Sequence, residues 1–221
     1  MTAEAHDPHQ RTDPRVAYFD GQAETWDLSG PDPAAGVRRM EELRAPIGLE
    51  AGCDVLEVGC GTGSLTAWLV EAVRPGRVTA VDFAPKMIAK AAVKAIDASF
   101  RCLDVCADDL GEGLYDVALC FHSFPHFRDQ AAALRNLARS LKASGRLAVV
   151  HLRGSEQINA FHASVGGAVR GDRLPKGERW DRLLAEAGLT RQELRDGEDG
   201  FLLVARRPAA SADASVSTIA S

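Results

Sequence analysis

Short apolar runs alternate with helix-like segments along most of the chain. Runs rich in Val, Leu and Ala predict strands, whereas apolar positions three and four residues apart predict helices. The predicted strands are residues 54–58, 77–83, 99–104, 115–120, 145–152, 189–195 and 201–206. The predicted helices are residues 64–73, 87–96, 129–141 and 178–187, and Pro85 suits the first turn of the second one. Strands this apolar need cover on both faces, so the pattern predicts an α/β sheet with helices on both sides.

The end of the chain departs from this alternation. Only a short turn at residues 196–200 joins the last two predicted strands, and a connection that short permits only an antiparallel hairpin. We therefore expect a Rossmann-like, doubly wound sheet of seven strands, mostly parallel, with the last strand antiparallel.

A chain of 221 residues can bury one good core, so a single folded domain is expected. We assign this domain to residues 34–207 and a preceding cap segment to residues 16–33, whose aromatic residues include Tyr18, Phe19 and Trp26. Residues 1–15 lack apolar periodicity and residues 208–221 are small and polar. Both ends are therefore predicted to be disordered tails.

Composition narrows the possible partners. A net charge of −5 gives no basic surface for nucleic acid or anionic lipid, so a small molecule is the expected partner. The longest apolar runs are too short to cross a bilayer, and the first residues lack the order of a signal peptide. An odd number of cysteines, five, suits reduced thiols. We expect a cytoplasmic protein, either a monomer or a homodimer.

A glycine-rich loop follows the first predicted strand and consists of Gly59, Cys60, Gly61, Thr62 and Gly63. Glycines let the backbone approach a ligand closely, but the third one comes a residue too early for the dinucleotide fingerprint GxGxxG. Carboxylates lie at three successive strand ends, namely Glu57, Asp82 and Asp104. A carboxylate at the second strand end can accept both hydroxyls of a ribose, so the acidic loop suits a cationic nucleoside better than a pyrophosphate.

Two motifs resemble a known family. VLEVGCGTG looks like the first motif of class I S-adenosylmethionine methyltransferases, and VDFAPKMIAKA resembles their second-strand motif. The segment YFDGQAETWD is similar to the opening of the ubiquinone- and menaquinone-biosynthesis (type 11) group. The resemblance implies S-adenosyl-L-methionine as cofactor and the cap as a lid over it. It places Glu57 and the glycine loop near the amino-acid part, Asp82 on the ribose, Phe83 and Met87 against adenine, Asp104 or Val105 at the adenine amino group, and Trp26 and Phe121 elsewhere around the cofactor.

Methyl transfer from a sulfonium is an in-line displacement, so the enzyme needs chiefly to position the nucleophile in a dry site. His122 and His126 follow the fourth strand on the side of the glycine loop and are the candidate general bases. A structural role for His126 is an equal alternative, because the family often has a histidine before an aspartate here. His122, His126, His151 and His162 are weak metal candidates, because Pro125 keeps the first two off one regular helix. No metal is expected.

The predicted function is methylation of a small-molecule O, N, S or C nucleophile. A non-catalytic cofactor-binding module and, less favoured, a nicotinamide-dependent oxidoreductase stay open as alternatives. A nucleic-acid methyltransferase is disfavoured by the acidic balance and by the absence of a motif such as NPPY. Substrate recognition is expected from residues 154–176, after the fifth strand.

Overall fold

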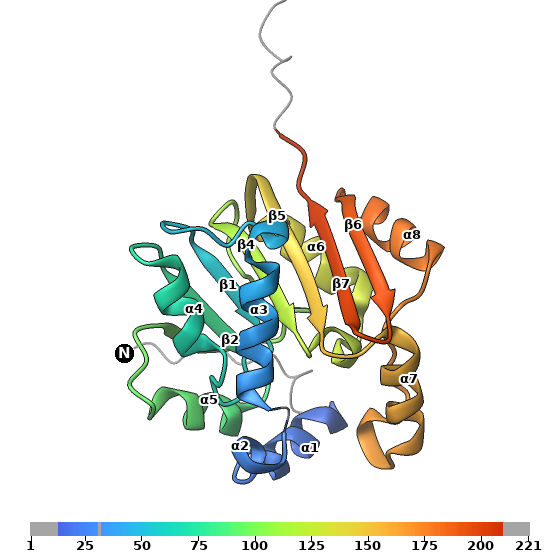
Figure 1. Ribbon diagram of the computed structural model, residues 1–221. Coiled ribbons are helices and arrows are strands. Elements are labelled where there is room, and N and C mark those ends of the chain that lie inside the picture. The colour runs from blue at the N-terminus through green and yellow to red at the C-terminus, as the bar shows by residue number, and fades with distance from the viewer. Residues whose placement is uncertain (1–12, 31, 210–221) are drawn as a thin grey trace, which may run out of the picture.

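The computed structural model describes residues 13–30 and 32–209. A seven-stranded sheet with the order β3-β2-β1-β4-β5-β7-β6 forms its centre (Figure 1). The strands are β1 (Val55–Val58), β2 (Val78–Asp82), β3 (Ser99–Cys102), β4 (Tyr115–Phe121), β5 (Leu141–His151), β6 (Thr190–Gly197) and β7 (Gly200–Arg206). Strands β3, β2, β1, β4 and β5 pair in parallel, whereas β7 pairs antiparallel with both β5 and β6. The predicted fold class is confirmed.

Helices cover both faces of the sheet and its carboxyl edge (Figure 1). They are α1 (Pro14–Gln22), α2 (Trp26–Ser29), α3 (Pro33–Ile47), α4 (Thr66–Val73), α5 (Pro85–Ala92), α6 (Gln130–Ser140), α7 (Ser155–Ser164) and α8 (Glu178–Glu186). Two short 3₁₀ helices are η2 (Phe124–His126) and η3 (Gly167–Val169). Most of the predicted tails, residues 1–12 and 210–221, lies outside the described residues. The last three residues of the predicted first tail are described, and Asp13 caps α1 through a hydrogen bond from the backbone N–H of Arg15.

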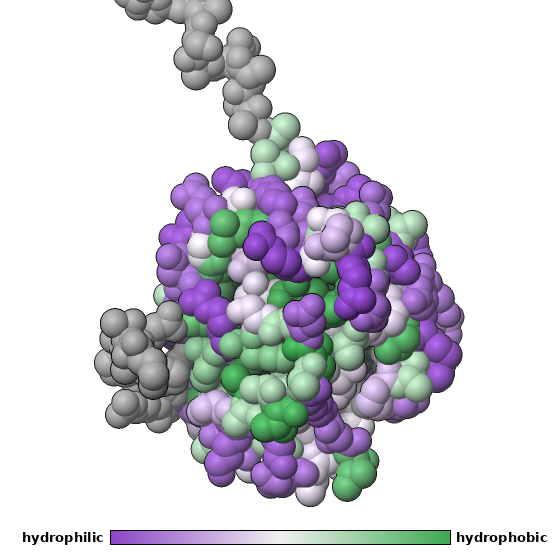
Figure 2. Space-filling model, turned by 90° about the vertical axis from the view of Figure 1, so that its left-hand side faces the viewer, coloured by the Kyte–Doolittle hydropathy of each residue, from purple (hydrophilic) through white to green (hydrophobic). Residues whose placement is uncertain are grey.

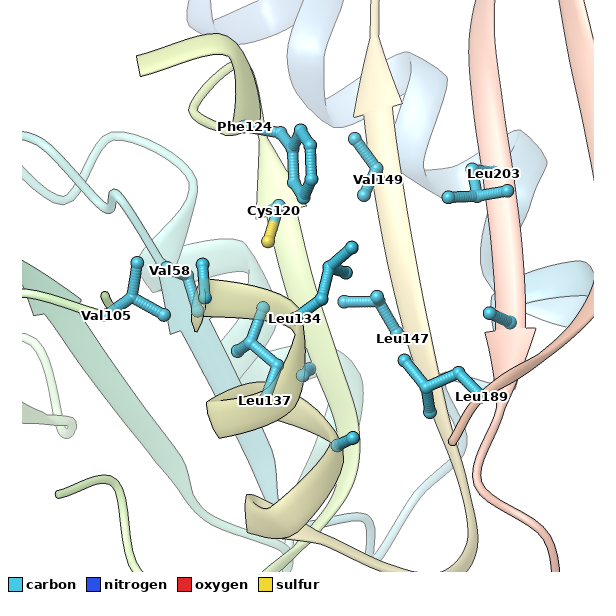
Figure 3. Close-up of a cluster of buried hydrophobic side chains, with 14 of the residues drawn as sticks. Val58, Val105, Cys120, Phe124, Leu134, Leu137, Leu147, Val149, Leu189 and Leu203 are labelled. Carbon is cyan, nitrogen blue, oxygen red and sulfur yellow. The ribbon is translucent and has the colours of Figure 1, made fainter. Parts of the chain in front are cut away.

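Each central strand divides its side chains between two apolar layers. Leu56 and Cys120 belong to the layer covered by α6 and α8, whereas their neighbours Val55 and Leu119 belong to the layer covered by α3 and α4. Figure 3 shows part of the first layer, where Leu134 and Leu137 of α6 lie against the strands. The alternation follows from the period of two along a strand, and it explains why the strands are apolar at almost every position.

Among the element boundaries that differ from the sequence-based expectation, three have a clear structural reason. Helix α5 ends at Ala92 rather than at residue 96, and Ala95 then takes a left-handed φ of 52° that no α-helix can continue. Strand β5 begins at Leu141 rather than at residue 145, because Leu141 pairs with Tyr115 across a register shift. Strand β3 ends at Cys102 rather than at residue 104, because the backbone there turns into the loop that Asp104 caps.

The cap helices α1 and α2 lie at the carboxyl end of the parallel strands (Figure 1). They share a third apolar cluster with α5 and η3, built around Phe19, Met87 and Val169.

The view from the side of α4 and α5 shows an apolar band between hydrophilic side chains (Figure 2). Within residues 13–30 and 32–209, no helix has the length and apolar character needed to span a membrane.

Candidate functional site

A hollow with about 1040 Å³ of empty space, counted to its open mouth, lies at the carboxyl ends of β1, β2 and β4, under the cap. Most of the predicted cofactor residues line it: Trp26, Glu57, Gly59, Cys60, Gly61, Asp82, Phe83, Met87, Val105 and Phe121. The two candidate bases, His122 and His126, also line it. This cofactor hollow therefore brings both candidate bases together with most of the predicted cofactor residues.

The glycine loop is held close to the loop after β4. Gly59 has a φ of 73°, and a Cβ added there would lie 2.3 Å from the Cβ of Ser123. Ser123 Oγ donates a hydrogen bond of 2.6 Å to the carbonyl oxygen of Val58. Only glycine can occupy position 59 without moving the glycine loop away from the loop after β4. Gly59 therefore allows these two loops to lie close together at the wall of the hollow.

Asp82 lies at the end of β2 with both carboxylate oxygens bound to backbone amides. Oδ2 accepts from Gly61 N and Oδ1 accepts from Ala84 N, each at 2.9 Å. Burial raises the pKa of Asp82 to about 6, although these two amides act to lower it. Each carboxylate oxygen keeps a lone pair for another donor, so Asp82 can accept a pair of ribose hydroxyls.

Glu57, in β1, is only 3% exposed and accepts a hydrogen bond of 2.6 Å from Thr66 Oγ1. Burial raises its pKa to about 8; the bond from Thr66 opposes this rise, and the negative charge of Asp82 adds to it. No cationic side chain of the described residues forms an ion pair with Glu57 or Asp82, so ionising either group places a buried, unpaired negative charge in the cofactor hollow. A bound cation would relieve the cost of that charge.

Two of the predicted cofactor residues serve other contacts. Asp104 accepts hydrogen bonds from Cys106 N at 2.8 Å and from Arg128 Nε at 2.8 Å, and it does not line the hollow. The neighbouring Val105 does. Gly63 has a φ of 79° and packs toward Ala91 of α5, outside the wall of the hollow.

Polar contacts fasten the cap over the hollow. Asp27 accepts a hydrogen bond of 2.5 Å from Thr62 Oγ1 in the glycine loop, and it forms an ion pair of 2.8 Å with Lys94. Glu24 and Lys90 form a second ion pair of 2.6 Å between the cap and α5. The cap is therefore tied to the glycine loop and to α5 with the residues that follow it.

An aromatic side chain anchors the cap from within. Besides its chain neighbour Tyr18, Phe19 meets three rings edge-on, with centroid distances of 5.9 Å to Trp26, 5.7 Å to Phe83 and 5.0 Å to His126. Phe19 is 8% exposed and lines the hollow, so part of the site wall is contributed by α1.

His126 forms a hydrogen bond that the sequence does not reveal. Its Nδ1 lies 2.7 Å from Oδ2 of Asp172, whose side chain is fully buried. Arg15 Nη2 donates to the other oxygen of Asp172 at 2.6 Å. Burial acts to raise the pKa of Asp172, but the bonds from His126 and Arg15 outweigh it, and the pKa is lowered. Asp172 is therefore an ionised partner that fixes the orientation of the imidazole ring.

His122 lies in a different environment, with a φ of 58°. Burial, together with smaller contributions from the charges of His126 and Arg153, lowers its pKa to about 4. Its Nε2 accepts a long hydrogen bond of 3.4 Å from Leu152 N, which favours the neutral tautomer with the proton on Nδ1. His122 is thus better suited to donate a hydrogen bond than to take a proton.

The four histidines lie in two ring pairs. His122 and His151 have centroids 5.0 Å apart, and His126 and His162 have centroids 4.9 Å apart. Neither His151 nor His162 lines the cofactor hollow. Across the described part of the chain, no group of three or more His, Cys, Asp or Glu residues is arranged to hold a metal ion.

Sequence reasoning missed part of the wall. The residues it did not assign to the site are Phe19, Asp32, Pro33, Gly36, Ser64, Leu65, Val58, Val81, Leu103, Ser123 and Phe127. One local signal was available, because Asp32 followed by Pro33 is typical of a helix start, and Asp32 does cap α3. Phe19 had been assigned to the cap but not to the cofactor.

Comparison with known proteins finds a matching family model and several similar enzymes. Residues 55–145 match the family model described as a methyltransferase domain. A malonyl-[acyl-carrier protein] O-methyltransferase of Acetivibrio thermocellus is 38% identical over 97 residues, which are 43% of this chain and 34% of that protein. A ubiquinone biosynthesis O-methyltransferase of Xanthomonas oryzae pv. oryzae is 30% identical over 162 residues, which are 69% of this chain and 65% of that protein. The chain spans less than two thirds of either relative.

A solved structure shares the fold. The 1,6-didemethyltoxoflavin-N1-methyltransferase of Burkholderia thailandensis, solved with 1,6-didemethyltoxoflavin and S-adenosylhomocysteine, superposes with a TM-score of 0.66. The two chains are 22% identical, and the match covers 94% of this chain and 93% of the other. At this identity the likeness establishes the arrangement of the sheet and helices.

Proposed function

We propose that this chain is a class I S-adenosylmethionine-dependent methyltransferase and that it methylates a small molecule. The observation that carries the proposal is the pairing of two buried carboxylates, Glu57 and Asp82, with the open backbone of the glycine loop in one hollow. Cofactor binding and methyl transfer at this hollow are the activity that this arrangement supports best.

The residues of the hollow fit S-adenosyl-L-methionine chemically. The ammonium or sulfonium charge would offset the cost of ionising Glu57. Asp82 offers two carboxylate oxygens to the ribose, and Phe83, Met87 and Val105 offer apolar contact to the adenine. When bound, the cofactor supplies an electrophilic methyl group. The chain itself has to orient the acceptor and keep water out, and we assign the second task to the cap, residues 16–33.

His126 is our candidate for the group that takes a proton from the acceptor. Its Nδ1 faces the buried carboxylate of Asp172 at 2.7 Å, and the ring lines the cofactor hollow. With Nδ1 donating to Asp172, Nε2 is left as the acceptor that can receive a proton, and the ionised Asp172 stabilises the resulting imidazolium. His122, neutral at physiological pH, would donate a hydrogen bond to the acceptor instead.

The partner is proposed to be a small acceptor rather than nucleic acid or a membrane, in accord with the net charge of −5. Oxygen is the favoured atom, because both curated relatives carry O-methyltransferase names; N, S and C nucleophiles remain in the proposal. Five free cysteines suit a reducing cytoplasm. The methyltransferase domain is assigned to residues 34–207, and we propose a monomer or a homodimer.

Calorimetric titration with S-adenosylmethionine, S-adenosylhomocysteine and NADH tests the proposal. Saturable binding of the first two ligands, with no heat from NADH, is the expected result. Binding of NADH alone would favour the nicotinamide alternative, and no binding of any ligand would overturn the cofactor assignment. A screen of small acceptors with S-adenosylmethionine then tests turnover. Binding without turnover of any acceptor class would favour the non-catalytic module.

A further inference from the structure

A second hollow lies beside the cofactor hollow and has about 1560 Å³ of empty space, counted to its open mouth. Its walls come from Arg15 of α1, from Pro125 and residues 127–131, from α7 and α8, and from residues 171–176 between these two helices. Phe127 lines both hollows. Asp172 lines the second hollow and orients His126 of the first, so the two hollows share a wall.

The second hollow is strongly cationic on a chain of net charge −5. Its lining contains five cationic side chains, namely Arg15, Arg128, Arg173, Lys176 and Arg179, and only two carboxylates, those of Asp129 and Asp172. Both carboxylates are engaged, because Asp129 caps α6 and Asp172 binds His126 and Arg15. The carboxylates that line the hollow therefore offset only part of its positive charge.

Three of these cations are available to a ligand. Arg15 and Arg128 already form ion pairs, with Asp172 and Asp104 respectively. Arg173, Lys176 and Arg179 are exposed, and no ion pair joins any of them to a carboxylate of residues 13–30 or 32–209.

The backbone that carries these cations is fixed in place. Asn159 of α7 binds Leu174 twice, with its Oδ1 accepting from Leu174 N at 2.7 Å and its Nδ2 donating to Leu174 O at 3.0 Å. Gln130 Nε2 donates to the carbonyl oxygen of Arg173 at 2.8 Å. Leu174 and Pro175 are buried, so the cations project from an anchored segment rather than from a loose loop. Preorganised cations lose less entropy when an anion binds.

We propose that this second hollow binds an oxyanion, a carboxylate or a phosphate, carried by the methyl acceptor. Arg side chains match both groups through paired N–H donors, and Lys adds a point charge. The acceptor would then place its nucleophile at His126 and extend past Phe127, which lines both hollows, to place its oxyanion in the second one. The assignment of the oxyanion to the acceptor rests on the proposed function; the anion site itself does not.

The test compares a triple variant with a matched control. Arg173→Gln/Lys176→Gln/Arg179→Gln removes the three unpaired cations, and Arg74→Gln/Arg77→Gln/Arg135→Gln removes three exposed cations elsewhere. Inorganic phosphate and malonate are titrated into each ¹⁵N-labelled protein at constant ionic strength, and amide shifts are followed. We expect saturable shifts in residues 126–131 and 171–179, weakened by at least about tenfold in the triple variant and unchanged in the control. The tighter of the two anions identifies the oxyanion.

The result that would overturn the site is an absence of saturable shifts, or equal shifts in the triple variant. Sedimentation with phosphatidylglycerol vesicles, but not with phosphatidylcholine vesicles, together with no response to the soluble anions, would also overturn it in favour of a membrane surface. For the acceptor, paired phenols that differ only in a carboxylate or a carboxamide are assayed. We expect preference for the carboxylate, lost in the triple variant; preference for the amide contradicts the assignment.

S-adenosylmethionine titration of the same proteins separates the two proposals. Unchanged affinity in both triple variants is expected, because none of the six residues lines the cofactor hollow. The other outcome is that neither the parent protein nor any variant binds S-adenosylmethionine, while the parent still binds phosphate or malonate. In that case the proposed function and the acceptor assignment both fail, and the anion site stands.

Discussion

The two neighbouring hollows recognise charge in opposite ways. The cofactor hollow holds buried carboxylates, with Glu57 3% and Asp82 7% exposed, and their hydrogen-bond partners come from the chain itself. The second hollow presents exposed cations, such as Arg173 and Lys176, on an anchored backbone. Burial strengthens electrostatic interactions, and an unpaired buried charge destabilises the folded protein. An exposed charge stays hydrated, so it has little effect on stability, and salt screens it. The buried carboxyl groups of the cofactor hollow therefore lower the stability of the fold. The exposed cations of the second hollow do not.

The largest expected effect is on the cofactor hollow alone. Asp82→Ala removes both acceptors for a ribose and should weaken S-adenosylmethionine binding by at least about 100-fold, because each bond to a charged group contributes roughly 1.5–3 kcal/mol. Calorimetry at pH 8 measures the change. Phosphate or malonate shifts in the second hollow should be unaffected, and a parallel loss there would mean that the two hollows are not independent.

The next prediction concerns the effect of the buried carboxyl group of Glu57 on the stability of the fold. The folded protein holds the proton of Glu57 up to about pH 8, whereas the unfolded chain releases it near 4.5, so stability falls as the pH rises between these values. Glu57→Gln keeps an acceptor for Thr66 and removes this loss. The variant should be more stable than the parent by on the order of 3 kcal/mol at pH 8 and about equal to it at pH 4.5.

Urea unfolding at the two pH values measures this difference. Lys176→Gln, in the second hollow, is the matched control and should leave the stability nearly unchanged at both. Equal stability of Glu57→Gln and the parent at pH 8 would show that Glu57 is not strained by burial, and the contrast between the hollows would lose its basis.

A smaller effect, on kcat, is expected from Asp172, which lies in the wall that the two hollows share. Asp172→Asn removes the charge that orients His126, so kcat for an identified acceptor should fall by about tenfold or more while the dissociation constant for S-adenosylmethionine stays the same. The acidic limb of the pH profile of kcat should move as well. Asp172→Glu restores a carboxylate and should recover part of the rate. An unshifted pH profile would leave Asp172 with a packing role only.

The smallest effect concerns the cap, where exposed ion pairs act. Asp27→Asn weakens the contacts to Thr62 and Lys94, and S-adenosylmethionine affinity should fall by about threefold to fivefold. Added NaCl should weaken binding by the parent more than binding by the variant, because screening acts on the ion pair. Calorimetry across a salt series measures both. A salt response identical in the two proteins would argue against a cap held by charge.

Local signals were sufficient to predict the cofactor hollow. Glycines 59 and 61 and the acids at two strand ends are specified within a few residues of sequence, and sheet topology brings those ends together. The partner of His126 could not be predicted in this way, because Asp172 lies 46 residues away on an irregular segment. The second hollow depends on similar long-range contacts, such as the one between Arg15 and Asp172, 157 residues apart.

Prediction also failed where a local signal was weak or overridden. Helix α3 was not predicted, since its apolar positions Met40, Leu43 and Ile47 are interrupted by charged residues. Strand β5 starts early because a tertiary pairing, Leu141 with Tyr115, extends it beyond its own apolar run. The match of residues 55–145 to a methyltransferase domain agrees with the resemblance to class I methyltransferases, whereas the individual site residues remain predictions that the experiments above address.

The reversed direction of β7 has a practical consequence for handling the protein. Because β7 runs against β5, Arg206 pairs with Arg146 at the amino end of that strand, and Phe201 pairs with His151 at the end nearer the hollows. Arg207 therefore lies at the opposite edge of the sheet from both hollows. A biotin or other immobilisation handle attached at Pro208 or Ala209, which are exposed, would orient the protein on a sensor surface with both hollows facing the flowing ligand.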